Sequence, residues 1–145
     1  MASKQIASRR EGAEIYHGAA LCKQKAHELL DHFHLPKGLM PLSNLVEVGF
    51  NRTTGFIWLK QNKTFKYWFK SLGASSYGPE ITAFIEDGRM RKLTGIKSKE
   101  MMIWITLSDI YVDDADPTKI TFATPMGLSK SFPVTAFEEE AEEMK

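Results

Sequence analysis

The apolar residues of the first third of the chain recur at intervals of three and four, which predicts an amphipathic helix over residues 14–33. Pro36 disfavours helical angles at the residue before it and Gly38 favours a turn, so we expect the helix to end near His34. Residues 1–12 are polar and are predicted to form a disordered N-terminal lead. The apolar stripe that should face the core consists of Ile15, Ala19, Cys22, Ala26, Leu29, Leu30 and Phe33.

From Val46 onward the hydrophobic period changes to two, which is typical of strands with one buried face. Residues 51–55 (NRTTG) have the composition of a hairpin loop, and the Asp-Gly pair at residues 87–88 is a second strong turn signal. Between them, residues 62–63 are predicted to turn the chain into a further hairpin. Residues 99–112 are apolar on both faces, so they are expected to form a central strand.

These elements predict a mainly β (α+β) fold, in which the N-terminal amphipathic helix packs on a largely antiparallel β-barrel or half-barrel of about seven to eight strands. The 145 residues, 43% of them hydrophobic, suit a single domain, which we place at residues 13–137. Residues 138–145 are acidic and are expected to be a disordered tail. Such a tail usually serves solubility, and the alternative is that it screens a basic surface of the same protein.

Charge is distributed unevenly along a chain whose formal net charge is only +1. Residues 60–99 carry nine basic and three acidic side chains, whereas residues 109–145 carry three basic and nine acidic ones. The near-neutral total gives no reason to expect general affinity for nucleic acid.

Cys22 is the only cysteine, so an intramolecular disulfide is impossible and a reducing compartment is favoured. The N-terminus is polar and lacks the apolar core of a signal peptide. The longest apolar run, Met101 to Ile105, is far shorter than the roughly 20 residues of a membrane-spanning helix. We therefore expect a cytoplasmic protein that is not secreted, with peripheral contact to membranes left open.

Five segments of the chain together carry a resemblance to a known family. They read YHGAALC and HELLDHFHLPKGLMPL in the predicted helix and its exit, and EVGFNRTTGFIWLKQ in the first hairpin. They continue with KLTGIKSKEMMIWITLSDI in the predicted central strand and TPMGLSKSFPVTAF near the end. Together they span residues 16–137, and in this order they resemble a family of plant proteins catalogued as domain of unknown function 538. The resemblance implies a small β-barrel with an N-terminal helix.

The same resemblance implies no agreed activity and no established catalytic residues. Two general proposals attach to the family: a likeness to lipid-binding barrels of the bactericidal permeability-increasing type, and a hydrolytic role in chlorophyll turnover linked to stress. Many members carry a signal peptide that is missing here, so the secreted role assumed for those members is not extended to this chain.

His27, Asp31 and His34 fall on one face of the predicted helix at spacings that could hold a metal ion. The segment HELLD resembles the zinc motif HExxH, but Asp31 replaces its second histidine, so a solvated polar flank is the favoured interpretation. Cys22 lies on the apolar stripe and is interpreted as a packing residue. Ser75 nearly matches the motif G-x-S-x-G, but a tyrosine replaces the second glycine. No catalytic residue, metal or cofactor is predicted.

The segment KQNKTFKYWFK interleaves lysines with aromatic residues, a pattern suited to anionic surfaces. A lipid surface fits better than single-stranded nucleic acid because the overall charge is nearly neutral. The simpler alternative is that lysines protect an edge strand from aggregation while the aromatic residues fill the core. Lys97 and Lys99 would widen the basic surface if the third hairpin lay beside it. The predicted anionic-surface residues are Lys60, Lys63, Lys66, Lys70, Arg89, Arg91 and Lys92.

Large apolar side chains are more numerous than a sheet with one solvated face requires, which favours a ligand site. We expect a non-enzymatic module that binds an apolar or amphipathic, lipid-like ligand at the barrel, or an anionic membrane surface. Two alternatives are a protein-interaction scaffold without a cavity and an esterase-type hydrolase acting on a pigment or lipid. The predicted ligand-binding residues are Trp58, Phe65, Tyr67, Trp68, Met102 and Trp104.

Overall fold

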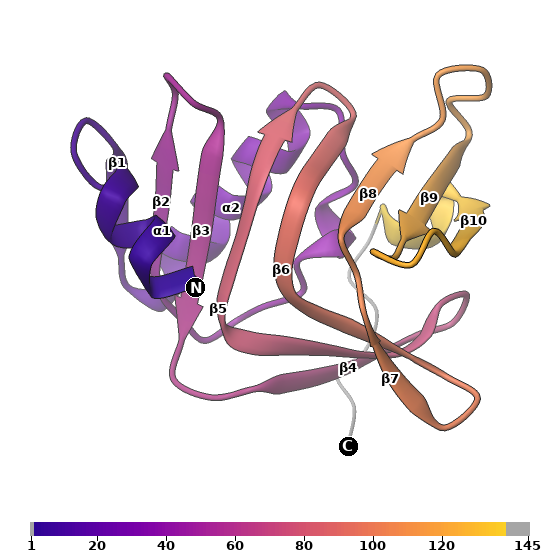
Figure 1. Cartoon of the computed structure of the whole chain (residues 1–145). Coiled ribbons are helices and arrows are strands. Elements are labelled where there is room, and N and C mark those ends of the chain that lie inside the picture. The colour runs from indigo at the N-terminus through magenta and orange to yellow at the C-terminus, as the bar shows by residue number, and fades with distance from the viewer. Residues whose placement is uncertain (1, 139–145) are drawn as a thin grey trace.

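The computed structural model describes residues 2–138, which form one antiparallel sheet of ten strands with helices on both faces (Figure 1). The helices are α1 (Ala2–Arg9) and α2 (Ala19–His32), with two short 3₁₀ helices, η1 (Lys37–Leu39) and η2 (Val134–Phe137). The strands are β1 (Glu14–His17), β2 (Leu45–Asn51), β3 (Phe56–Gln61), β4 (Phe65–Phe69), β5 (Gly73–Glu86), β6 (Arg89–Glu100), β7 (Ile103–Thr106), β8 (Asp109–Val112), β9 (Lys119–Ala123) and β10 (Ser129–Pro133).

The predicted mainly β, antiparallel class is confirmed. Of the predicted barrel or half-barrel, the closed barrel is wrong because the sheet is open, and the described residues form ten strands rather than seven to eight. Among the described residues the strand order is β1-β2-β3-β5-β6-β8-β9-β10, and the two end strands do not pair with each other. Alternating apolar residues show which face of a strand is buried, but not which edges of the sheet meet. Here helical segments cover the inner face instead, since Phe137 of η2 is buried in the same core as Leu30 of α2.

Strands β5 and β6 are long enough to take part in two regions of the sheet. Near their connecting turn they pair with β3 and β8, whereas residues 73–77 and 96–100 pair with β4 and β7. We call this second region, made of β4, β7 and those two segments, the wing; it extends below the main sheet in Figure 1. Gln61 fixes the bend, because its Nε2 donates 2.9 Å hydrogen bonds to the carbonyl oxygens of Tyr77 and Gly78.

The main core lies between the sheet and α2. Cys22, Ala26 and Leu30 of α2 are buried against inward-facing residues of β2 and β3, among them Val48 and Leu59. These two strand residues are directly opposite each other in the β2–β3 register, so the predicted alternation of the first hairpin is confirmed. The predicted helical stripe is confirmed for the three α2 residues.

The N-terminal segment differs from the predicted disordered lead. α1 covers the outer face of the sheet, and its Ile6 is buried in a small second cluster with Phe56 and Trp58 of β3. A single isoleucine in a polar segment produces no periodic signal, so its burial depends on the aromatic residues that β3 presents to it. Of the predicted acidic tail only Glu138 is among the described residues, and residues 139–145 lie outside them.

The predicted helix over residues 14–33 is divided into a strand and a shorter helix. Residues 14–17 form β1, which pairs with β2, and Gly18 separates this strand from α2 with a φ of 95°. Glycine takes such a conformation at little cost, so it is a suitable break between the two elements. Ile15 therefore packs near the α1 cluster rather than on the helical stripe.

Two of the three predicted hairpins are present. Residues 51–55 connect β2 to β3, and residues 87–88 connect β5 to β6. The hairpin predicted at residues 62–63 is wrong, because β3 pairs with β5 and β4 forms its own hairpin with the start of β5. The predicted central strand is also wrong: Met101 and Met102, with φ values of 48° and 73°, make a tight turn that separates β6 from β7.

Candidate functional site

An apolar cleft of about 350 Å³ lies between the β6–β7 hairpin of the wing and the β9–β10 hairpin. On the wing side, Ser98 is opposite Ile105 and Glu100 is opposite Ile103 in the β6–β7 register. These four residues therefore share the face of the wing that lines the cleft. The apolar lining consists of Leu72, Met101, Ile103, Ile105, Leu107, Phe122 and Leu128.

The polar and charged residues that line the cleft are Ser98, Glu100, Thr124, Ser129 and Lys130. Lys130 Nζ donates to Glu100 Oε2 at 2.6 Å and so connects the β9–β10 hairpin to the wing. Thr124 Oγ1 is buried and has no hydrogen-bond partner among the described residues. A hydroxyl that lacks a partner in a buried position can bond to a bound ligand at little desolvation cost. The cleft thus combines apolar walls with one charged pair and three hydroxyl groups, of which that of Thr124 is buried without a partner among the described residues.

The rim of the cleft is unusually apolar for an exposed surface. Met101 is 92% exposed, Ile103 is 64% exposed and Leu128 is 58% exposed, and all three also line the cleft. Methionine is flexible and fits irregular apolar partners, so this rim can adapt to a chain that enters the cleft. Exposed apolar surface beside a cleft is typical of binding sites.

None of the six predicted ligand-binding residues lines this cleft. Three of them serve packing. Trp58 is completely buried beneath α1, Tyr67 is buried in the main core, and Phe65 is partly buried against that core. They therefore contribute to the stability of the sheet.

The other three predicted ligand-binding residues lie on the outside of the wing. Trp68 is 52% exposed, Trp104 is half-buried, and Met102, at the β6–β7 turn, is 85% exposed. The structure brings Trp68 and Trp104 onto one face but turns them away from the cleft. The residues that do line the cleft were missed because no local pattern connects β7 with the distant β10.

The predicted basic surface is divided between two parts of the molecule. On the main sheet, Lys60 and Arg91 each form an ion pair, and the guanidinium of Arg89 lies 4.4 Å from the centre of the Tyr111 ring. Lys92 is exposed on the same strand as Arg91. The remaining three residues are exposed on or beside β4: Lys63, Lys66 and Lys70.

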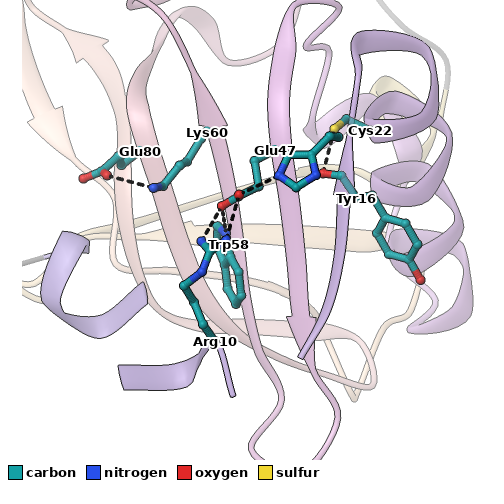
Figure 2. A network of polar contacts seen from close by, with 8 residues as sticks. Arg10, Tyr16, Cys22, Glu47, Trp58, Lys60 and Glu80 are labelled. Carbon is teal, nitrogen blue, oxygen red and sulfur yellow. Dashed lines mark hydrogen bonds and ion pairs between the residues drawn. The ribbon is translucent and has the colours of Figure 1, made fainter. Parts of the chain in front are cut away.

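A second polar site, which sequence reasoning missed, surrounds Glu47 on the outer face of β2 (Figure 2). Glu47 Oε2 accepts 2.8 Å hydrogen bonds from Arg10 Nη1 and Trp58 Nε1, and His17 Nε2 lies 2.9 Å from Oε1. The hydrogen bond from Arg10 is the main reason that the pKa of Glu47 is lowered to about 2. Gly49 makes room for this arrangement, because a Cβ at that position would overlap the Trp58 indole. The Glu47 site is a clamp that fastens the N-terminal segment to the sheet.

We expect this clamp to make the protein sensitive to acid. Because the pKa of Glu47 in the folded protein is lowered to about 2 from 4.5, its contribution is fully present above pH 4.5 and is lost as the pH falls towards 2. The difference corresponds to about 3 kcal/mol of unfolding free energy. Urea unfolding at a series of pH values should show this loss for the wild type and a smaller loss for Glu47→Gln. Equal losses in both proteins would assign the acid sensitivity to other carboxyl groups.

The three residues considered for metal binding, His27, Asp31 and His34, do not surround a common point, because the two histidines have different partners. His34 Nδ1 pairs with Asp87 on the β5–β6 turn at 2.5 Å, and His27 Nε2 lies 3.3 Å from the carbonyl oxygen of Met40. Within residues 2–138 there is no group of three His, Cys, Asp or Glu side chains that could hold a metal ion.

The two candidate nucleophiles are both buried in packed surroundings. Cys22 is fully buried, its Sγ donates to the carbonyl oxygen of Tyr16 at 3.4 Å, and burial raises the pKa of its thiol. Ser75 is 1% exposed, and its Oγ forms no hydrogen bond among the described residues. A serine nucleophile needs a base within hydrogen-bonding reach, so this geometry gives the esterase alternative no support.

The described helices include none with the length and apolar character needed to cross a membrane.

The fold and the cleft together define the class of this protein. It is a mainly β protein built on one open antiparallel sheet, with an apolar cleft between the wing and the β9–β10 hairpin. The chain belongs to the family described as "Protein of unknown function, DUF538", whose model matches residues 26–138. The predicted family is thereby confirmed. The match includes the whole cleft and begins within α2, after Arg10 and His17 of the Glu47 clamp. No curated protein and no solved structure matches the chain.

Proposed function

We propose that this protein binds an amphipathic, lipid-like ligand without chemical conversion, with the apolar chain of the ligand in the cleft between the β6–β7 and β9–β10 hairpins. The observation that carries the proposal is the apolar lining itself, which is exposed at the rim and interrupted by only a few polar groups. Small-molecule sites typically combine mostly apolar walls with a few polar groups that orient the ligand.

The size of the cleft supports a ligand that is only partly enclosed. A volume of about 350 Å³ is near the lower end of the roughly 300–1,000 Å³ typical of ligand pockets. A single flexible acyl chain can fill such a space while its head group stays at the rim. The open rim at Met101 and Leu128 gives the chain a route of entry.

The charged pair at the rim indicates the chemistry of the head group. Lys130 pairs with Glu100, and its side chain is 58% exposed. A carboxylate or phosphate head group can compete with Glu100 for this ammonium group, because charge-assisted hydrogen bonds to either anion are of comparable strength. Thr124 lies in the same cleft and offers a hydroxyl to the ligand.

The test is a fluorescence titration with cis-parinaric acid, a fatty acid with a fluorescent chain, in the absence of vesicles. We expect saturable binding of one probe per protein. Leu128→Glu should weaken binding by about tenfold or more, because it places a charge at the apolar rim, and tenfold corresponds to about 1.4 kcal/mol. Ile105→Trp should also reduce binding by filling the cleft.

Met126→Glu is the matched control for this titration. It makes the same change of charge in the same β9–β10 turn, but Met126 is 82% exposed and does not line the cleft. Its affinity for the probe should stay close to that of the wild type. If Leu128→Glu binds as well as Met126→Glu, or the wild type binds no probe, the cleft is not a site for a lipid-like chain.

A further inference from the structure

The outward face of the wing carries two tryptophans and three lysines that the sheet register brings together. Across the strands of the wing, Trp68 is opposite Ala74, and Lys99 is opposite Trp104. Two residues away along the same strands, Lys66 is opposite Ser76, and Ser76 is opposite Lys97. Because residues that face each other across an antiparallel pair point to the same side, these side chains form one surface. We call it the wing face; it consists of Lys66, Trp68, Lys97, Lys99 and Trp104.

Among the described residues, no acidic side chain pairs with the lysines of the wing face. Lys66 Nζ lies 5.6 Å and Lys99 Nζ lies 5.5 Å from the centre of the Trp104 ring. Within the described residues Lys66, Lys97 and Lys99 take part in no ion pair, and the other outward residues of the wing strands include no carboxylate. This differs from Lys60, Arg89 and Arg91 of the main sheet, which are paired with acidic side chains.

The turn at the end of the wing is apolar. Met101 and Met102 occupy the tip of the β6–β7 hairpin and are 92% and 85% exposed. Met126, in the β9–β10 turn on the other side of the cleft, is 82% exposed. Three exposed methionines in two turns that flank one cleft are typical of a surface that contacts an apolar partner.

We infer that the wing face docks on an anionic lipid bilayer, with its lysines at the head groups, its tryptophans at the interface, and the methionine tips entering the apolar layer. Tryptophan prefers the boundary between water and hydrocarbon, and clustered lysines are attracted to anionic lipids. Single-stranded nucleic acid could also stack on the tryptophans, but it offers no apolar layer to Met101 and Met102. The observations therefore favour the bilayer.

This docking orientation would bring the cleft close to the membrane. Met101 belongs both to the tip and to the cleft lining, so the rim of the cleft lies beside the docking surface. A lipid-like chain could then pass from the bilayer into the cleft without crossing water. The docking surface itself does not depend on the cleft being occupied.

The first experiment is co-sedimentation of the full chain with vesicles of phosphatidylcholine, with and without phosphatidylglycerol. We expect binding only to the anionic vesicles, decreasing as salt is added because salt screens exposed charges. The triple variant Lys66→Glu, Lys97→Glu, Lys99→Glu should bind about tenfold or more weakly. None of these three lysines lines the cleft, so cis-parinaric acid binding should be unchanged in this variant.

The control variant Lys37→Glu, Lys92→Glu, Lys119→Glu has the same change of net charge at exposed positions outside the wing. It should sediment with anionic vesicles nearly as the wild type does. Equal losses in the two triple variants would overturn the inference, because net charge alone would then explain binding. Binding of the wild type to single-stranded RNA but not to anionic vesicles would overturn it as well.

A second experiment tests the orientation, using anionic vesicles whose acyl chains carry bromine. Bromine quenches tryptophan fluorescence at short range, so Trp68 and Trp104 should be quenched on binding while the buried Trp58 is not. Quenching should disappear in the double variant Trp68→Phe, Trp104→Phe, in which Trp58 is the only remaining tryptophan. Quenching that persists in this variant would place the membrane on another face.

Discussion

Replacement of Gly95 by alanine is expected to lower the free energy of unfolding by about 3 kcal/mol or more, through backbone strain and a close contact. Gly95 has a φ of 88°, and a Cβ there would overlap the carbonyl oxygen of Glu80 and lie 3.0 Å from Ile81 Cα. Both groups belong to the backbone of β5, which cannot move without disturbing its pairing with β3. Equilibrium urea unfolding, followed by tryptophan fluorescence, measures the change.

Gly127→Ala separates the two causes of this loss. Gly127 has a similar φ of 84°, but a Cβ added there would meet no atom within 4 Å. Only the conformational strain should remain, so the expected cost is about 1 kcal/mol. If the two variants lose equal stability, the close approach of β5 and β6 at Gly95 is not important.

Glu47→Gln is expected to cost about 3 kcal/mol, because it removes the charge that three neighbouring groups stabilise in a buried position. Glu47 is 8% exposed, and the amide cannot accept from Arg10, His17 and Trp58 as the carboxylate does. The stability of the contact between α1 and the sheet should fall most, since Arg10 connects α1 to the sheet through Glu47. Trypsin should therefore cleave after Arg9 and Arg10 faster than in the wild type, in addition to the lower unfolding free energy.

Glu14→Gln is the matched control for the Glu47 variant. Glu14 pairs with Arg52, but its side chain is 37% exposed, so the expected cost is below about 1 kcal/mol. Trypsin cleavage near α1 should be unchanged in this variant. Similar losses in the two variants would mean that burial of the Glu47 carboxylate gives the clamp no special importance.

The first hairpin shows how far local patterns lead. Residues 51–55 contain a loop composition between two alternating segments, and Gly55 takes a φ of 81° in the turn. All of this information lies within about fifteen residues, so it is readable before any tertiary contact is known. The same holds for the turn at residues 87–88 and for the α2 stripe around Cys22 and Leu30.

The N-terminus and the segment of residues 99–112 show where local patterns fail. Ile6 is one apolar residue among polar ones, and it becomes part of a core only because Phe56 and Trp58 lie beneath it. Conversely, Met101 and Met102 look like interior residues of an apolar strand, yet they form an exposed turn. Hydrophobicity alone does not distinguish a residue that is buried by its own domain from one that is left exposed for a partner.

By itself, therefore, the sequence determined the mainly β class, two of the hairpins, the buried face of α2 and the family. Only the tertiary structure decided that the sheet stays open, that β5 and β6 bend into a wing, and that the cleft and the wing face exist. The physical reason is the range of the interactions. Turn chemistry and side-chain alternation act between neighbours in the chain, whereas strand partners and clefts result from contacts between segments that are far apart in sequence.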